Sequence, residues 1–132
     1  MARSFSLLIH VRIEAQIRSF VEQLPKSEKD QIVTQIHTAF QKLKSDPTGS
    51  QNVLFHENRN PALVGKVRKM YVGGNEGYRL MNLVLTDKAV ILPFYMSDVK
   101  RSLFNYGSVN WDIANEIQSD FLSGNIKKFK QI

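Results

Sequence analysis

Apolar residues recur along the first third of the chain with two different periods. Alternation over residues 4–11 predicts a strand. Apolar positions at three- and four-residue steps over residues 13–24 then predict an amphipathic helix, which Pro25 ends. A second helical stripe covers residues 32–43, with Ser27 as a suitable N-cap and Asp46-Pro47 as its end. The short connection between these helices predicts an antiparallel helical hairpin.

The rest of the chain reads as strands followed by a final helix. Residues 48–62 are polar and turn-rich, with room for a short strand at 53–55. Residues 64–72, 78–85 and 88–95 predict three strands of an antiparallel meander. Apolar residues spaced by four over residues 112–122 predict the last helix. The order β-α-α-β-β-β-α indicates the α+β class. The helical hairpin would cover one face of a mostly antiparallel twisted sheet and leave the other face for another role.

Composition narrows the choice of compartment and partner. The 132 residues, 42% hydrophobic and 23% charged, fit one globular domain over residues 1–132. The absence of cysteine excludes disulfides and thiolate metal sites and fits a cytoplasmic protein, and the sequence lacks a membrane-spanning apolar run. The net charge of +6 suggests a polyanionic partner such as nucleic acid, although it could also serve solubility alone.

Several segments, taken in order, resemble a known family. They are LPKSEKDQIVTQIHTAFQKLKSDP for the hairpin, LVGKVRKMYV for a basic strand, GYRLMNLVLTDKAVILPFYM for two apolar strands, and VKRSLFNYG after them. Together they resemble the RelE/ParE superfamily of bacterial toxins over nearly the whole chain, closest in look to YhaV-type members. The resemblance implies a RelE-like fold.

The resemblance also implies a function, with alternatives. RelE-like members are metal-independent endoribonucleases that need no cofactor, cut mRNA, often on the ribosome, and are silenced by a cognate antitoxin. An acidic antitoxin would suit this basic chain. ParE-like members share the fold but poison DNA gyrase without catalysis. A third alternative is an RNA-binding module that does not cleave. A membrane partner is not expected.

Metal-free RNA cleavage needs a base, a cation on the scissile phosphate and an acid for the leaving oxygen. The chain has three histidines, scattered along it, and the sequence shows no carboxylate cluster, so no metal site is expected. Arg79 matches the family's Gly-Tyr-Arg arginine, which helps to bind the phosphate. We expect it at the end of a buried strand, facing an open basic cleft. The alternative is a structural ion pair with Glu76 or Asp98.

The basic strand supplies further candidates. The resemblance implies that this strand carries a catalytic Lys-x-Lys pair, used as base and phosphate holder. Lys66 and Arg68 keep that spacing, with an arginine, a poor proton acceptor, in place of the second lysine, so Lys66 or Lys69 would have to act as the base. Alternation would put these two on one face and Lys69, an RNA-contacting candidate, on the other. The long connection at residues 73–77 leaves the register against Arg79 open by a residue or two. Alternatively, these charges only keep an edge strand soluble.

The segment after the last strand completes the predicted site. The resemblance implies that Lys100 contacts RNA, that Arg101 serves the phosphate or leaving group, and that Tyr106 stacks on a base. Core packing is the alternative for Tyr106. Trp111 and the final helix read as core, and in the family this helix and the neighbouring grooves also receive the antitoxin.

Overall fold

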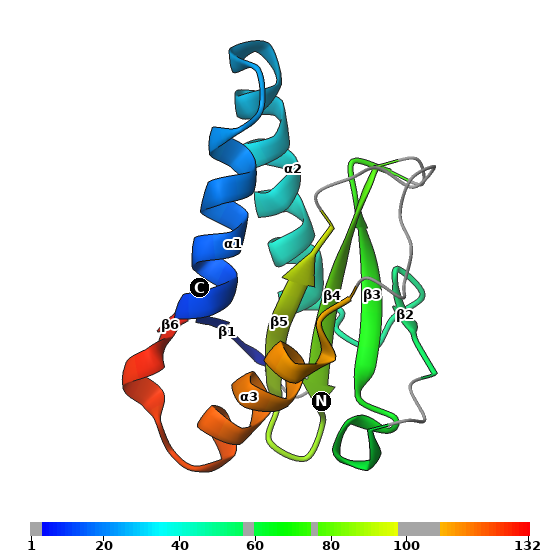
Figure 1. Ribbon diagram of the computed structural model, residues 1–132. Helices are drawn as coiled ribbons and strands as arrows, with labels where there is room; N and C mark the ends of the chain where they lie inside the picture. The colour runs from blue at the N-terminus through cyan, green and yellow to red at the C-terminus, as the bar shows by residue number, and fades with distance from the viewer. Residues whose placement is uncertain (1–3, 57–59, 75–76, 98–108) are drawn as a thin grey trace.

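The computed structural model describes residues 4–56, 60–74, 77–97 and 109–132. These described residues form three helices and six strands, with short 3-10 turns at Pro61–Leu63 and Ile126–Lys128, and Figure 1 shows how they are arranged. The helices are α1 (Val11–Glu22), α2 (Lys26–Ser45) and α3 (Trp111–Leu122). The strands are β1 (Ser6–His10), β2 (Asn52–Leu54), β3 (Val67–Val72), β4 (Tyr78–Leu85), β5 (Val90–Met96) and β6 (Phe129–Gln131).

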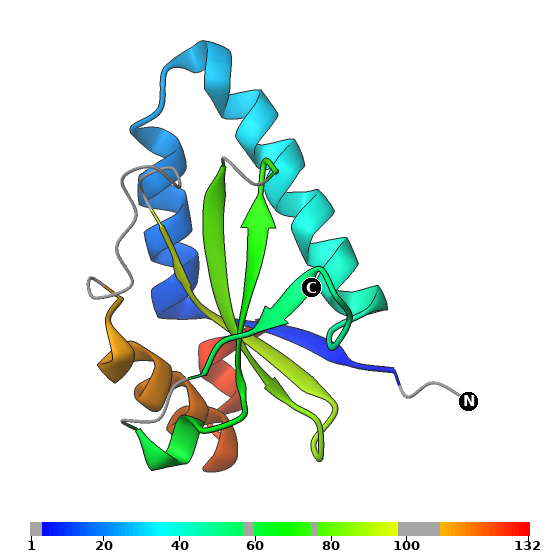
Figure 2. The ribbon, with the colours of Figure 1, turned by 90° about the vertical axis from the view of Figure 1, so that its right-hand side faces the viewer.

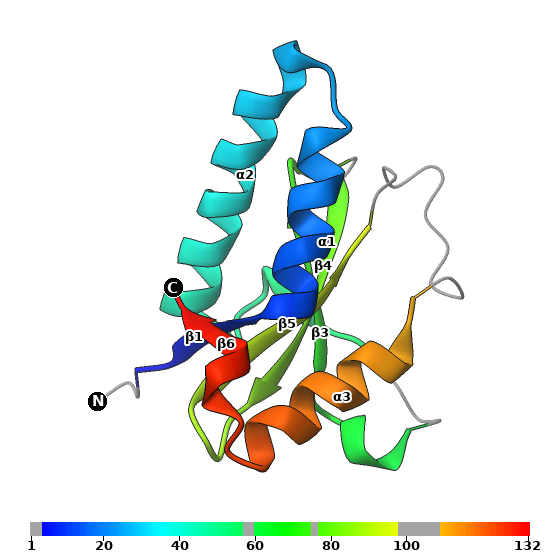
Figure 3. The same ribbon diagram turned by 60° about the vertical axis from the view of Figure 1, so that its left-hand side comes forward.

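The six strands form one mixed sheet in the order β2-β3-β4-β5-β1-β6. Strands β2 to β5 pair antiparallel, as the meander predicts, whereas β1 joins β5 in parallel. Strand β6 then pairs antiparallel with β1 and lies beside it in Figure 3. The α+β class and the mostly antiparallel sheet are therefore confirmed.

The helical hairpin of α1 and α2 covers one face of the sheet (Figure 1). Figure 2 shows its two helices side by side, with β3 and β4 in front of them. The apolar stripes of the helices pack on the residues of β1, β3, β4 and β5 that point to this side. This core comprises Leu7, Ile9, Ile13, Phe20, Ile32, Ile36, Ala39, Phe40, Leu43, Met70, Val72, Leu80, Val84, Ile91 and Met96.

The opposite face carries a second core under α3, which crosses the sheet nearer the β4–β5 turn (Figure 1). The expectation that this face is left for another role is thus wrong for the half that α3 covers. Periodicity predicted that these residues form a helix, but it did not indicate which face of the sheet the helix packs against. Residues pointing to this side include Leu63, Val67, Met81, Leu83, Leu85, Val90, Leu92, Phe94, Val109, Ala114 and Ile117.

Element ends differ from the sequence prediction in a few places. Helix α2 begins at Lys26 with Pro25 at its N-cap, so Ser27 is not the cap. A proline ahead of the first helical residue already supplies a fixed φ, and no side-chain cap bond is present there. Strand β3 begins at Val67 rather than residue 64, because Pro61–Leu63 forms a 3-10 turn. Among the described residues, no helix is long and apolar enough to cross a bilayer.

Candidate functional site

Arg79 lies near the start of β4, on the face that α3 covers only further along the sheet. Its backbone is fixed to the end of β5, because its N–H donates to Oγ of Ser97 at 2.8 Å and its carbonyl accepts from the Ser97 N–H at 2.9 Å. The residue is only 4% exposed. The expected open cleft is therefore closed around Arg79, and a phosphate could reach the guanidinium only after neighbouring side chains move.

Among the described residues, contacts from two directions hold the guanidinium of Arg79. Its Nη1 donates to the carbonyl oxygens of Gly77 at 3.1 Å and Tyr78 at 3.5 Å. Its Cζ lies 3.9 Å from the centroid of the Tyr71 ring, so the cation stacks on the aromatic face. Gly77 is required here, because a Cβ at this position would collide with the carbonyl oxygen of Val72.

Tyr71 and Lys69 of β3 share the face of Arg79. Tyr71 is the direct cross-strand partner of Arg79, and directly paired residues point to the same side of a sheet. Lys69 lies two residues before Tyr71 and opposite Met81, so it points the same way. Both side chains are half-buried. One end of this face thus gathers a lysine, a tyrosine and an arginine, and strands β3, β4 and β5 contain no carboxylate.

Lys66 lies far from this group. Its carbonyl accepts from the N–H of Val84, which is five residues along β4 from Arg79, or roughly 17 Å. Its Nζ donates to Oε1 of Gln118 in α3 at 3.2 Å. The structure therefore ties Lys66 to α3 at the opposite end of the sheet from Arg79.

Arg68 points to the other side of β3. Strand alternation puts it with Met70, on the hairpin side, and its Nη1 donates to the carbonyl of Asn52 at 2.9 Å. The prediction that Lys66 and Arg68 share one face as a pair is wrong, because β3 begins only at Val67 and alternation does not extend back to Lys66. The two-residue spacing that shares a face with Arg79 is Lys69-Met70-Tyr71.

A buried amide pair supports the strands beside Arg68. Asn52 and Asn82 are both fully buried and exchange two side-chain hydrogen bonds, at 2.9 and 3.0 Å. The Asn52 amide also donates to the carbonyl of Pro47 at 2.8 Å. Asn82 lies opposite Pro93 where the β4–β5 register shifts, a position at which proline is tolerated in a sheet. These bonds pin β2 and the preceding loop to the central strands.

Three predicted site residues, Lys100, Arg101 and Tyr106, lie outside the described residues, as do Glu76 and Asp98. Their places, and the ion pairs considered for Arg79, therefore stay predictions. The neighbouring Tyr78 points away from Arg79, into the hairpin core, where its ring meets Phe20 edge-on with the centroids 4.9 Å apart. Burial raises the pKa of the Tyr78 hydroxyl, and the nearby Glu28 carboxylate raises it further.

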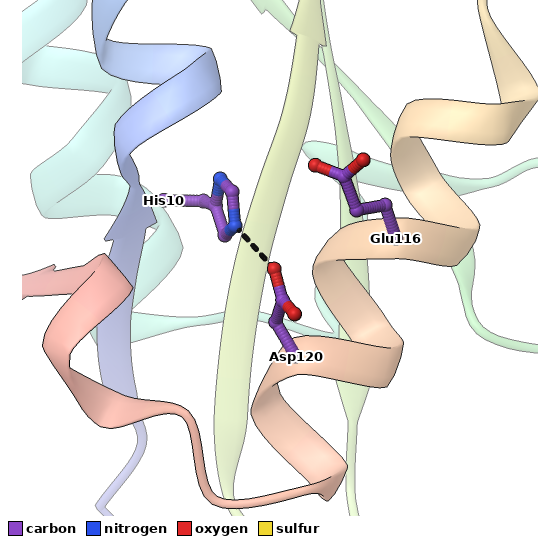
Figure 4. Close-up of side chains that lie close together, drawn as sticks. All are labelled: His10, Glu116 and Asp120. Atoms are coloured by element: carbon purple, nitrogen blue, oxygen red, sulfur yellow. Dashed lines mark hydrogen bonds and ion pairs between the residues drawn. The ribbon is translucent and has the colours of Figure 1, made fainter.

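A second polar cluster joins the first strand to α3 (Figure 4). Nε2 of His10 lies 2.8 Å from Oδ2 of Asp120, and Glu116 lies one helical turn before Asp120. Arg12 bonds to Glu116 at 2.7 Å, and Lys128 lies 3.4 Å from Asp120. The His10 hydrogen bond, helped by bonds from Asn125 and Lys128, lowers the pKa of Asp120 below its usual value.

Three potential ligand atoms of this cluster lie within 4.8 Å of one another, but their chemistry does not suit a metal ion. Nδ1 of His10 accepts the backbone N–H of Arg12 at 3.1 Å, so a neutral imidazole carries its proton on Nε2 and donates it to Asp120. A metal would need the Nε2 lone pair. Arg12 and Lys128 already neutralise the carboxylates. We interpret the cluster as a structural tie that closes α3 onto β1.

Two grooves lie on the hairpin side, where α2 passes the outer strands. The larger, of about 470 Å³, is lined by Gln35, Thr38, Ala39 and Lys42 of α2 and by residues of β2, β3 and their loops. The smaller, of about 210 Å³, continues along α2 past Gln31 and Glu28 toward Tyr78. Their lining is mainly amides, glycines and aliphatic groups, which suits contact with a polypeptide more than acid–base chemistry.

Sequence reasoning missed Tyr71 as a site residue. Its signal was present, because strand alternation from Lys69 selects residue 71 as the next side chain on that face. What the sequence left open was the register across residues 73–77, which decides whether residue 71 lies opposite Arg79. Only the observed pairing of Tyr71 with Arg79 resolves it.

Comparisons with known proteins bear on the fold. No family model matches the sequence, and no curated protein matches it. One solved structure, the free state of an Escherichia coli RelE toxin carrying two arginine-to-alanine substitutions, matches with a TM-score of 0.50 and 15% sequence identity. The match covers 89% of this chain and 97% of that chain. The chain therefore has the RelE-like toxin fold, as the order of its predicted elements indicates.

Proposed function

We propose that this chain is the toxin of a toxin–antitoxin pair, a metal-independent endoribonuclease that cuts mRNA and so inhibits translation. The observation that supports it most is the grouping of Lys69, Tyr71 and Arg79 on one face of strands that carry no carboxylate. Such a face attracts a phosphate backbone and does not repel it. The RelE-like fold is the second support.

In this proposal each cation has a separate task. Arg79 binds the scissile phosphate, because a planar guanidinium can meet two phosphate oxygens at once and stabilise the charge that develops on them. Lys69 contacts the RNA backbone beside it. Lys100, Arg101 and Tyr106 keep the roles that the family resemblance implies for them, in RNA contact, phosphate or leaving-group stabilisation, and base stacking.

The burial of Arg79 adds a requirement to this mechanism. At 4% exposure the guanidinium does not meet RNA in the described conformation. Cleavage therefore needs a step that uncovers it, and binding to RNA or to the ribosome could supply the free energy for that step. Weak cutting of free RNA and stronger cutting of ribosome-bound mRNA would follow from this requirement.

Primer extension on a reporter mRNA in a cell-free translation reaction tests the proposal. The wild-type chain should produce new stops, and Arg79→Ala should produce none while remaining folded. Lys88→Ala is the matched control, because Lys88 is an exposed cation in the turn at the far end of β4. It removes the same charge without touching the proposed site. No stops with wild type, while translation runs normally, would reject the proposal.

Binding and inhibition of DNA gyrase without catalysis is a second candidate. Two observations favour it: Arg79 is buried, and Arg68 is engaged with a backbone carbonyl, so neither cation is presented to a substrate in the described conformation. A supercoiling assay with purified gyrase separates the two candidates. Inhibition of supercoiling without RNA cleavage would support this candidate over the first.

The proposed partner in regulation is an acidic antitoxin, and the proposed compartment is the cytoplasm. The groove beside α2 offers Lys42 and several amides to such a chain. Co-expression of the toxin with an acidic protein that its own genome encodes beside it, where there is one, followed by affinity purification, tests this partner. Restored growth together with a stoichiometric complex is the expected result, and growth inhibition that persists despite expression of that protein would contradict it.

A further inference from the structure

The stacking of Arg79 on Tyr71 has a functional meaning if this face binds RNA. We propose that Tyr71 is a positioning residue, whose ring fixes the plane of the Arg79 guanidinium so that its N–H edge can meet a phosphate. This inference rests on the proposed function and names a residue that the sequence pattern did not select. It depends on the aromatic ring of Tyr71 and does not require its hydroxyl.

The geometry constrains the guanidinium in two different ways. Nη1 is anchored on the carbonyl of Gly77 at 3.1 Å, which fixes one corner of the group. The Tyr71 ring lies against the flat face, with Cζ 3.9 Å from the ring centroid, which prevents rotation about that corner. A guanidinium directs all its N–H bonds within its plane, so fixing the plane fixes the direction of every donor.

The position of Tyr71 in the sheet makes this contact specific. Tyr71 and Arg79 are direct cross-strand partners, and β3 and β4 remain in regular register from Val67 to Val72. The backbone of Arg79 is further held by the paired bonds to Ser97. Neither side chain can leave the contact through movement of its own strand. A long side chain with many rotamers is thereby kept in one orientation, so that binding costs less entropy once the guanidinium has been uncovered.

Two substitutions of Tyr71 separate the ring from the hydroxyl. Tyr71→Phe keeps the stacking surface and removes only the hydroxyl, whereas Tyr71→Leu removes both and leaves a smaller apolar side chain. In steady-state cleavage kinetics, Tyr71→Phe should keep kcat within about threefold of wild type. Tyr71→Leu should lower kcat about tenfold or more with little change in KM, because a misdirected donor is lost mainly from the transition state.

The double variant tests whether Tyr71 acts through Arg79. Tyr71→Leu combined with Arg79→Ala should cut no more slowly than Arg79→Ala alone, because the ring has nothing left to orient. Thermal unfolding of each variant accompanies the kinetics. A role in stability alone would lower the melting temperature without this non-additivity and without the rescue by phenylalanine.

An NMR measurement of the Arg79 side chain decides the inference even if no RNA is cut. The Nε–Hε signal, assigned by its loss in Arg79→Lys, should be ordered on the ps–ns timescale in wild type and Tyr71→Phe and mobile in Tyr71→Leu. Wild-type cleavage by Tyr71→Leu, equal damage by both substitutions, or an ordered signal in Tyr71→Leu would overturn it. A wild type that never cuts RNA would reject the proposed function, and the NMR result would then decide only whether the Tyr71 ring orders the Arg79 side chain.

Discussion

The Nζ of Lys66 lies 3.2 Å from Oε1 of Gln118, a residue of α3 that is itself only 4% exposed. The same Gln118 donates through Nε2 to the carbonyl of Ala62 at 3.0 Å. Its amide thus links α3 to the segment before β3, with Lys66 as one of its two partners. This contact gives Lys66 a structural role at the end of the sheet opposite Arg79.

We therefore predict that the two lysines of the basic strand behave differently. Lys66→Ala should keep RNA cleavage within about threefold of wild type, because Lys66 is roughly 17 Å from Arg79 along the strand. Lys69→Ala should weaken RNA binding. In a plot of the logarithm of the RNA association constant against the logarithm of the salt concentration, it should make the negative slope less steep by about 1, the value for one lost phosphate contact. Binding titrations at several salt concentrations measure this. A larger loss of activity and RNA binding in Lys66→Ala than in Lys69→Ala would instead place Lys66 in the site.

Gly77→Ala should both destabilise the fold and impair the Arg79 site. The added Cβ collides with the carbonyl of Val72, and relief requires movement of backbone that carries the Nη1 anchor of Arg79. We expect a loss of about 1–3 kcal/mol in the free energy of unfolding, measured by urea titration. Gly74→Asn is the control, because its surroundings are open and asparagine tolerates its φ of +82°. Equal effects at both positions would contradict the close-approach argument.

The buried amide pair should show strong coupling. Asn52→Ala removes both reciprocal bonds and leaves Asn82 Nδ2 with only 3.4 Å bonds to the carbonyls of Arg68 and Leu80, at a cost of about 1–3 kcal/mol in the free energy of unfolding. The double variant with Asn82→Ala should cost clearly less than the sum of the two single variants, since each single change already breaks the reciprocal bonds. Asn115→Ala, which loses only a 3.4 Å bond to Asn60, should cost less than about 1 kcal/mol. Strict additivity would refute the coupling.

Asp120 should make stability depend on pH in acid. Its pKa in the folded chain is lowered, chiefly by the His10 hydrogen bond, from an unfolded value near ~3.9. A lowered folded pKa means that the contribution is fully present above the unfolded value and is lost as pH falls through the folded one. Asp120→Asn should therefore lower the melting temperature at neutral pH, and its difference from wild type should shrink below about pH 4.

The control for this measurement is Asp112→Asn, at an exposed carboxylate in the first turn of the same helix. It should lower the melting temperature less at neutral pH. If the effect of Asp120→Asn stayed constant from pH 7 to the most acid pH that keeps the chain folded, the His10–Asp120 bond would not be the cause.

Removal of residues 129–132 should expose the edge of β1. Strand β6 pairs with β1 at Leu8, Ile9 and His10, and Phe129 packs edge-on against the His10 ring with the centroids 5.1 Å apart. We expect a loss of about 2–4 kcal/mol in stability from the half-buried Phe129 ring and the strand pairing. An unpaired edge also invites self-association, which light scattering would detect. Lys130→Ala, which breaks only an exposed ion pair with Glu14, should have little effect on either.

Periodicity predicted the larger elements because their burial is regular. The stripes of α1 and α2 and the alternation of β4 follow directly from which side of each element meets a core. Strand β4 is buried on both faces, so its sequence is mainly apolar and a charged residue such as Arg79 stands out in it. The face toward which Arg79 points was also predictable, because strand alternation puts it on the same side of β4 as Met81, Leu83 and Leu85.

Other features depend on contacts between distant segments and leave weak local signals. Strand β6 is three residues long and basic, so nothing in its own sequence indicates pairing with β1. The His10–Asp120 bond joins residues 110 positions apart. The register between β3 and β4 was ambiguous because the connection at residues 73–77 could absorb a shift. These long-range features decide where the Lys69–Tyr71–Arg79 group forms.

The place of β1 in the sheet has a consequence for biosynthesis. This first strand is flanked by β5 and β6, so the start of the chain finds its sheet partners only near the end. Strands that are far apart in the sequence pair only after a long loop has closed, which costs conformational entropy before any pairing bond forms. We therefore expect the sheet to assemble late and slowly. The nascent chain cannot complete this sheet until residues 129–131, which form β6, have left the ribosome that is making it. If the proposed function holds, the chain would therefore stay inactive toward its own ribosome until β6 has been made and has paired with β1.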